Sequence, residues 1–105
     1  METFDKREEG FERAFSHGEE LRFRARARRN RKLGAWAGEK LGLSGPPLEG
    51  YAAGFVAREI ESADDEALVA ELVKALAPVE MSEHRIRRRL EEFEAAAMQE
   101  LQAGR

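Results

Sequence analysis

Helical spacing of apolar residues runs through almost the whole chain and decides its fold class. The clearest case is the C-terminal segment, where apolar residues recur at steps of four and three, namely Ile86, Leu90, Phe93, Ala97 and Leu101. Ser82 precedes this run as a helix N-cap, and Gly104 suits its C-terminal end. The alternating patterns and hairpin dipeptides typical of β-strands are absent from the sequence. The chain is therefore predicted to be all-α, with its last helix over about residues 82–103.

Two shorter helices are predicted before it. Pro46 starts a helix over about residues 46–61, because proline is favoured in the first turn. Asp64 opens a second helix over about residues 64–77, which Pro78 ends. Their apolar faces are Leu48, Tyr51, Ala52, Phe55, Val56 and Ile60 in the first helix, and Leu68, Val69, Leu72, Val73 and Leu76 in the second.

The helix over about residues 20–42 carries a seam of mostly small residues in a heptad rhythm: Phe23, Ala27, Asn30, Gly34, Ala37 and Leu41. Small side chains allow a neighbouring helix to approach closely, and Asn30 is suited to fix the register of the pairing. Leu33, Trp36 and Leu43 add a second apolar side, so residues 33–43 should be buried on both flanks. These features predict a four-helix bundle with this helix at its centre.

The N-terminal residues carry an apolar stripe of their own. Phe4, Phe11 and Phe15 share one helical face, which an unbroken helix would place roughly 100° away from the seam that begins at Phe23. The stripe is either a satellite of the core or a set of anchors for the groove of a partner protein.

Gly10 and Gly18 weaken the connection between this segment and the bundle, each by about 1 kcal/mol relative to alanine in a helix. We therefore expect two parts, an amphipathic N-terminal arm over residues 1–17 that can detach, and a four-helix bundle over residues 18–105.

Charge is strongly segregated along the chain although the net charge is only −3. Residues 21–41 carry eight bases and one acid, whereas residues 42–81 carry eight acids and two bases. The basic block Arg22–Lys32 thus has three interpretations: a solvated face partly paired with the acidic segment, a protein-binding surface, or a nucleic-acid-binding surface. The block lacks a recognition motif and has little aromatic interleaving for base stacking, which argues against nucleic acid.

Little in the sequence supports catalysis, metal binding or membrane insertion. The chain has no cysteine, and its two histidines, His17 and His84, lie too far apart to form a local metal motif. No catalytic or phosphate-binding motif is present, and no apolar run approaches the length of a membrane span. The charged first residues do not resemble a signal peptide. We expect a cytoplasmic protein that is not an enzyme and binds no metal.

Several strings identify a family. The opening TFDKRE, the run ARRNRKLGAWAGEKLG and the later SEHRIRR closely resemble the zeta subunit of alphaproteobacterial ATP synthases, and the similarity covers nearly the whole chain. The resemblance implies a four-helix bundle whose N-terminal segment inhibits ATP hydrolysis by entering an interface between the alpha and beta subunits near the gamma subunit. It also implies a location peripheral to the inner membrane through the synthase.

Carried onto this chain, the resemblance makes Met1–His17 the inhibitory segment. It implies that Phe4, Phe11 and Phe15 are buried in the cleft, that Lys6, Arg7 and Arg13 face subunit carboxylates, and that Arg28, Arg29 and Arg31 add docking contacts. Arg26 departs from the family pattern, in which an acidic residue is more frequent before the ARRN run.

An alternative function is a small helical protein that senses nucleotides or binds nucleic acid through the basic helix Arg22–Lys32. Family members have been linked to purine nucleotides, but no local motif assigns such a site here. The leading hypothesis requires no cofactor and no DNA or RNA; its partners are the alpha, beta and gamma subunits.

Overall fold

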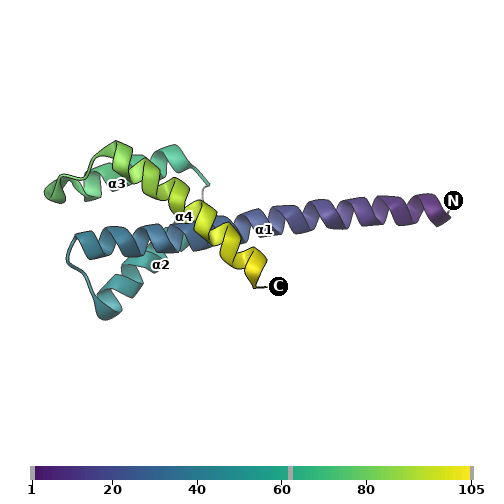
Figure 1. The fold of residues 1–105 in the computed structure, drawn as a ribbon, viewed down its shortest axis with the longest axis horizontal. Coiled ribbons are helices and arrows are strands. Elements are labelled where there is room, and N and C mark those ends of the chain that lie inside the picture. The colour runs from purple at the N-terminus through teal and green to yellow at the C-terminus, as the bar shows by residue number, and fades with distance from the viewer. Residues whose placement is uncertain (1, 62, 105) are drawn as a thin grey trace.

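The computed structural model describes the backbone of residues 2–61 and 63–104, and the side chains of residues 18–61 and 63–104. Its helices are α1 (Glu2–Lys40), α2 (Gly45–Glu61), α3 (Asp65–Ala75) and α4 (Glu83–Ala103), with a single 3-10 turn, η1 (Ala77–Val79), between the last two. The described backbone contains no strand. The predicted all-α, four-helix architecture is confirmed (Figure 1).

Helix α1 sets the shape of the molecule. At about 1.5 Å per residue, its 39 residues account for most of the 63 Å long axis, whereas the other two axes measure 26 and 22 Å. The C-terminal half of α1 lies within the bundle, and its N-terminal half projects from one end (Figure 1). Its backbone passes through Gly10 and Gly18 as one helix, so neither glycine ends it. Among the described side chains of α1, burial begins at Ala25.

Local signals in the sequence explain where the helices begin and end. Asp64 caps α3 by accepting a hydrogen bond from the Ala67 N–H at 3.1 Å, and Ser82 caps α4 by accepting one from the Arg85 N–H at 3.2 Å. Both predicted caps are confirmed. Helix α1 ends at Lys40, and Gly42 lies in the turn that follows, with a φ of +86° that favours glycine and lets the Leu43 N–H reach the Gly38 carbonyl at 2.9 Å.

The core lies between α1 and the other three helices and contains most of the residues that the spacing predicted. Its buried members are Leu33, Ala37, Phe55, Leu68, Val69, Leu72, Leu76, Ile86 and Leu90, with Trp36, Leu41, Tyr51, Val73, Met81 and Phe93 partly buried against them. Two expectations were wrong. Phe23 and Ile60, predicted to pack in the interface, are 48% and 67% exposed.

Close packing of α1 against α2 depends on two glycines of α1. A Cβ at Gly34 would lie 2.7 Å from Phe55 Cδ2 and 2.9 Å from the backbone Cα of Ala52, and one at Gly38 would lie 2.6 Å from Leu48 Cδ1. Such distances are too short for carbon atoms to coexist. At Gly34 one of the facing atoms belongs to the backbone of α2, so this helix can lie where it does only because Gly34 lacks a side chain, whereas at Gly38 the facing atoms belong to side chains. This confirms that the small residue Gly34 allows a close helix–helix approach.

We therefore predict that Gly34→Ala destabilises the bundle by about 1–3 kcal/mol, because the added methyl group overpacks a rigid contact. The matched control is Gly54→Ala in α2, where a Cβ meets nothing within 4 Å. The control should stabilise by up to about 1 kcal/mol through helix propensity alone. Urea unfolding followed by circular dichroism measures both, and equal stabilisation by the two alanines would contradict the packing argument.

Candidate functional site

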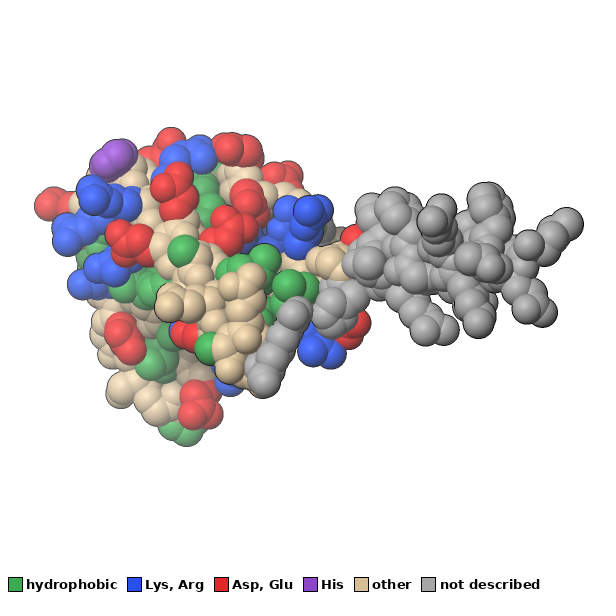
Figure 2. Space-filling view, turned by 45° about the vertical axis from the view of Figure 1, so that its right-hand side comes forward, with side chains coloured by type: hydrophobic (Ala, Val, Ile, Leu, Met, Phe, Trp, Pro, Cys, Tyr) green, Lys and Arg blue, Asp and Glu red, His purple; other side chains and the backbone are tan. Residues whose placement is uncertain are grey.

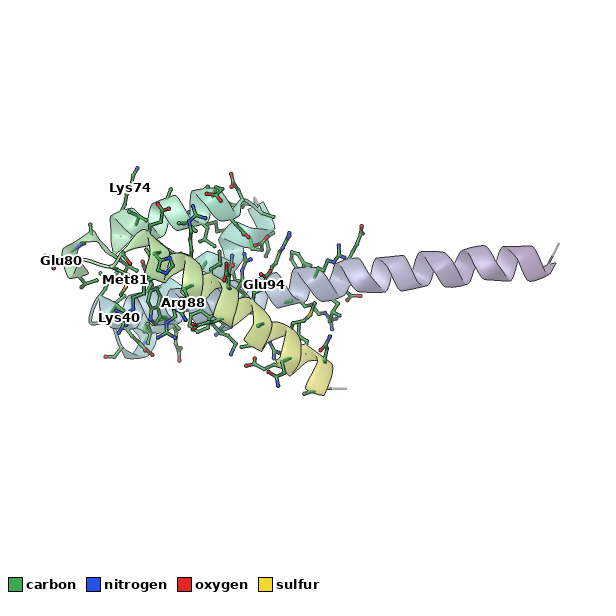
Figure 3. The ribbon with its side chains drawn as sticks, turned by 45° about the horizontal axis from the view of Figure 1, so that its top comes forward. Lys40, Lys74, Glu80, Met81, Arg88 and Glu94 are labelled. Carbon is green, nitrogen blue, oxygen red and sulfur yellow. The ribbon has the colours of Figure 1, made fainter. Side chains whose placement is uncertain are left out.

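A buried arginine joins all four helices at the end of the bundle from which α1 projects. The side chain of Arg29 on α1 is 0% exposed, and its guanidinium forms ion pairs with Glu59 of α2 at 3.3 Å, Asp65 of α3 at 2.8 Å and Glu94 of α4 at 3.5 Å. The pair with Asp65 is bidentate, since both terminal nitrogens donate to its carboxylate. Figure 3 shows Glu94 on α4 close to where this helix crosses α1.

Asn30 completes the network beside Arg29. Its Oδ1 accepts a hydrogen bond from Arg29 Nε at 3.0 Å, and its Nδ2 donates to the Phe55 carbonyl at 3.1 Å and more weakly to Glu59 at 3.5 Å. Because Asn30 and Glu59 are buried, displacement of one helix along the other would leave polar atoms without partners. This contact is consistent with the predicted role of Asn30 in fixing the helix register.

The expected docking role of Arg29 is therefore corrected. A side chain with no exposed surface cannot contact a partner, and its charge is used inside the bundle. The signal that the spacing analysis missed is that Arg29 lies four residues from both Ala25 and Leu33, which are themselves buried.

Much of the remaining basic block is also paired within the chain. Arg28 and Lys32 both contact Glu100 of α4, at 3.3 and 2.7 Å, and Arg24 pairs with Glu20 one turn earlier at 2.8 Å. The predicted interpretation as a partly paired, solvated face is thus supported, but the partners of these exposed cations come from α1 and α4. Among the described side chains of the block, only the buried Arg29 pairs with the acidic segment 42–81. Arg31 is exposed and forms no ion pair with the described side chains.

The site residues predicted in the N-terminal arm, namely Phe4, Lys6, Arg7, Phe11, Arg13 and Phe15, lie outside the described side chains. What the structure describes is the surface from which this segment leaves the bundle. Two hollows border α1 there. One lies against α2 and is lined by Phe23, Arg22, Arg26 and Ile60 among others, and the other lies against α4 and is lined by Arg22, Arg26, Glu91, Glu94 and Met98 among others.

A second basic cluster lies at the opposite end of the bundle. A shallow depression there is lined by Ser82, His84, Arg85, Arg88, Arg89 and Glu92. Glu92 pairs with both Arg88 and Arg89, and the Arg89 guanidinium lies 5.8 Å from the centre of the Trp36 ring. His84 is exposed, and Trp36, which its spacing predicted to be buried, is partly buried and packs against the core.

The described side chains offer no candidate metal centre. They contain no group of three His, Asp or Glu side chains placed to hold a metal ion, and no helix in the described part of the chain is long and apolar enough to cross a membrane. The fold is that of a small helical protein with one helix extended beyond its bundle (Figure 1). The family model for ATPase inhibitor subunit zeta matches residues 1–100, and the chain belongs to that family. No curated protein and no solved structure matches it significantly.

Family membership makes the protein regulatory rather than catalytic and associates it with inhibition of ATP synthase.

The buried network yields a stability prediction. Arg29→Met should destabilise the bundle by about 3–5 kcal/mol, because Glu59 is left buried without its partner. The matched control is Arg31→Met, two residues along the same helix but exposed, which should change the free energy of unfolding by less than about 0.5 kcal/mol. Urea unfolding measures both, and a variant at Arg29 as stable as the control would contradict the assigned role.

The ion pair between Lys32 of α1 and Glu100 of α4 predicts that the stability of the bundle depends on pH. The hydrogen bond from Lys32, with a smaller contribution from Arg28, lowers the pKa of Glu100 below its ordinary value of 4.5. A lowered pKa means that this contribution to stability is present above about pH 4.5 and is lost as the pH falls through the folded-state pKa. Glu100→Gln should therefore have a lower urea midpoint than the native protein at pH 7, with the difference shrinking as the pH falls through the folded-state pKa of Glu100. A difference in urea midpoint that stays constant from pH 7 into the acidic range would contradict this prediction.

Proposed function

We propose that this protein inhibits ATP hydrolysis by inserting residues 1–17 into the interface between the alpha and beta subunits of the catalytic head. Membership of the ATPase inhibitor subunit zeta family supports the inhibitory role. The observation that carries the insertion mechanism is that α1 continues as one helix beyond the bundle, so the N-terminal segment extends away from the core (Figure 1).

The chemistry of the segment suits a cleft between subunits. Phe4, Phe11 and Phe15 follow the i, i+7, i+11 spacing by which a helix presents one apolar face to a groove. Lys6, Arg7 and Arg13 lie between them in the sequence and supply cations for carboxylates of the alpha, beta or gamma subunit. The projecting helix blocks rotation of the gamma subunit in the hydrolytic direction while it occupies the interface.

The structure gives less support to the alternative based on the basic helix. Binding of nucleic acid through Arg22–Lys32 needs cations that are free to contact phosphates. Arg29 is buried, and Arg24, Arg28 and Lys32 are engaged by carboxylates of the same chain. The net charge of −3 further opposes a polyanionic partner.

The proposed mechanism predicts that a full-length variant with Phe4→Ala, Phe11→Ala and Phe15→Ala loses at least about 100-fold in inhibitory potency, since three apolar anchors are removed. Steady-state ATP hydrolysis by the catalytic head of the cognate synthase is measured against inhibitor concentration. The matched control is Val79→Ala, an exposed apolar residue in the bundle, which should inhibit as the native protein does. Full potency in the triple variant would overturn insertion of this segment.

A further inference from the structure

Exposed large apolar side chains are concentrated at the projecting end of the bundle. Among the described residues only Phe23, Ile60 and Val79 are large, hydrophobic and exposed, and the first two line the same hollow. They come from different helices, α1 and α2, so the fold itself brings them together. Isolated exposed apolar residues are ordinary, but a pair meeting at a hollow on a small protein is typical of a contact surface.

Two arginines accompany this pair. Arg22 and Arg26 are both exposed, lie one turn apart on α1, and line the hollows on both the α2 and the α4 side. Neither forms an ion pair within 4.0 Å in the described part of the chain, in contrast to Arg24 and Arg28 on the same helix. Figure 2 shows hydrophobic and basic side chains on the bundle next to the point where α1 leaves it.

The acidic groups that line the same hollows form no ion pair with these arginines in the described part of the chain. Glu19 and Glu59 line the hollow on the α2 side, and Glu91 and Glu94 line the one on the α4 side. Of these, Glu59 and Glu94 are committed to Arg29. Arg22 and Arg26 therefore remain available for carboxylates of another molecule, and arginine beside an aromatic side chain is the combination enriched where protein interfaces gain most of their affinity.

The position of this surface along α1 indicates what covers it. At about 1.5 Å per residue, Phe23 lies only about 9 Å beyond residue 17 along the helix axis. If residues 1–17 fill a cleft, the rim of that cleft must therefore approach Arg22, Phe23 and Arg26. Ile60 at the end of α2 lies at the same level, so the bundle meets the rim as the helix enters.

We propose that Arg22, Phe23, Arg26 and Ile60 form a collar that docks on the rim of the ATP synthase cleft, with apolar side chains covering Phe23 and Ile60 and carboxylates of the rim pairing with the two arginines. The proposal rests on the proposed insertion of the arm. The collar gives the inhibitor a second contact and stops the helix at a fixed depth, because the bundle is too wide to follow it.

The experiment compares full-length variants for binding to the isolated catalytic head. Phe23→Ser with Ile60→Ser removes the apolar part of the collar, and Arg22→Glu with Arg26→Glu reverses its charge. Each should weaken binding at least tenfold, and the effect of the charge reversal should shrink in high salt. The matched controls are Val79→Ser and Arg85→Glu, an exposed apolar residue and an exposed arginine away from the collar, which should bind within about twofold of the native protein.

Folding and binding are separated by two measurements. Circular dichroism and the urea midpoint report whether each variant is folded, and Phe23→Leu, which keeps an apolar surface, should bind within about threefold of the native protein. Loss of binding in folded collar variants, with the controls unchanged, supports the proposal. Native affinity in both collar variants overturns it.

Comparison with the triple phenylalanine variant distinguishes the collar from the arm. If that variant loses inhibition while the collar variants bind normally, the arm inserts without a collar contact. If the collar variants weaken binding while the triple variant inhibits fully, the insertion mechanism fails and the bundle alone docks. If the collar variants change only self-association, measured by sedimentation, the surface joins two copies of this chain and the proposal is overturned.

Discussion

The buried guanidinium of Arg29 is the constraint on which the arrangement of the four helices depends. Its carboxylate partners come from α2, α3 and α4, so the charge is fully compensated only when all three pack on α1 in one register. A buried ion pair contributes little net stability compared with apolar packing, but separation of its members is costly. The apolar core thus supplies most of the free energy of folding. Arg29 and Asn30 determine the one register in which the helices pack.

The same network explains why apolar residues are exposed beside it. With Arg29 and Glu59 occupying the inward positions at the projecting end of the bundle, Phe23 and Ile60 lie on the flanks of their helices and remain in contact with solvent. The bundle therefore has a polar interior and a partly apolar surface at this end, the reverse of the usual distribution. An exchange of this kind leaves exposed apolar side chains where α1 leaves the bundle.

Spacing and capping signals were sufficient to predict the helices. They did not predict which helix faces are buried at the end of the bundle from which α1 projects. Leu33, Leu72 and Ile86 are buried as their periodicity indicated, because apolar identity and position agree there. At the projecting end, residue type and position on the helix disagree. Phe23 and Ile60 are apolar but lie on faces that point toward solvent. Arg29 and Glu59 are charged but lie on faces that point into the bundle. A rule that assigns burial by residue type cannot detect such an exchange. The carboxylates that pair with Arg29 can be identified only from the packed arrangement of α2, α3 and α4.

Continuity of the N-terminal segment with the central helix also has an energetic consequence. A separate helix must form its first turn at a cost of about 4 kcal/mol, the free-energy equivalent of a nucleation constant near 10⁻³. In α1 the buried stretch from Ala25 to Ala37 already provides a packed helical nucleus, so helix upstream of it grows by propagation alone. The packing of α2 against Gly34 and the ion pairs of Arg29 hold that nucleus in place. The bundle thus lowers the cost of ordering the N-terminal segment, which we propose enters the synthase, and it also sets the direction in which that segment points.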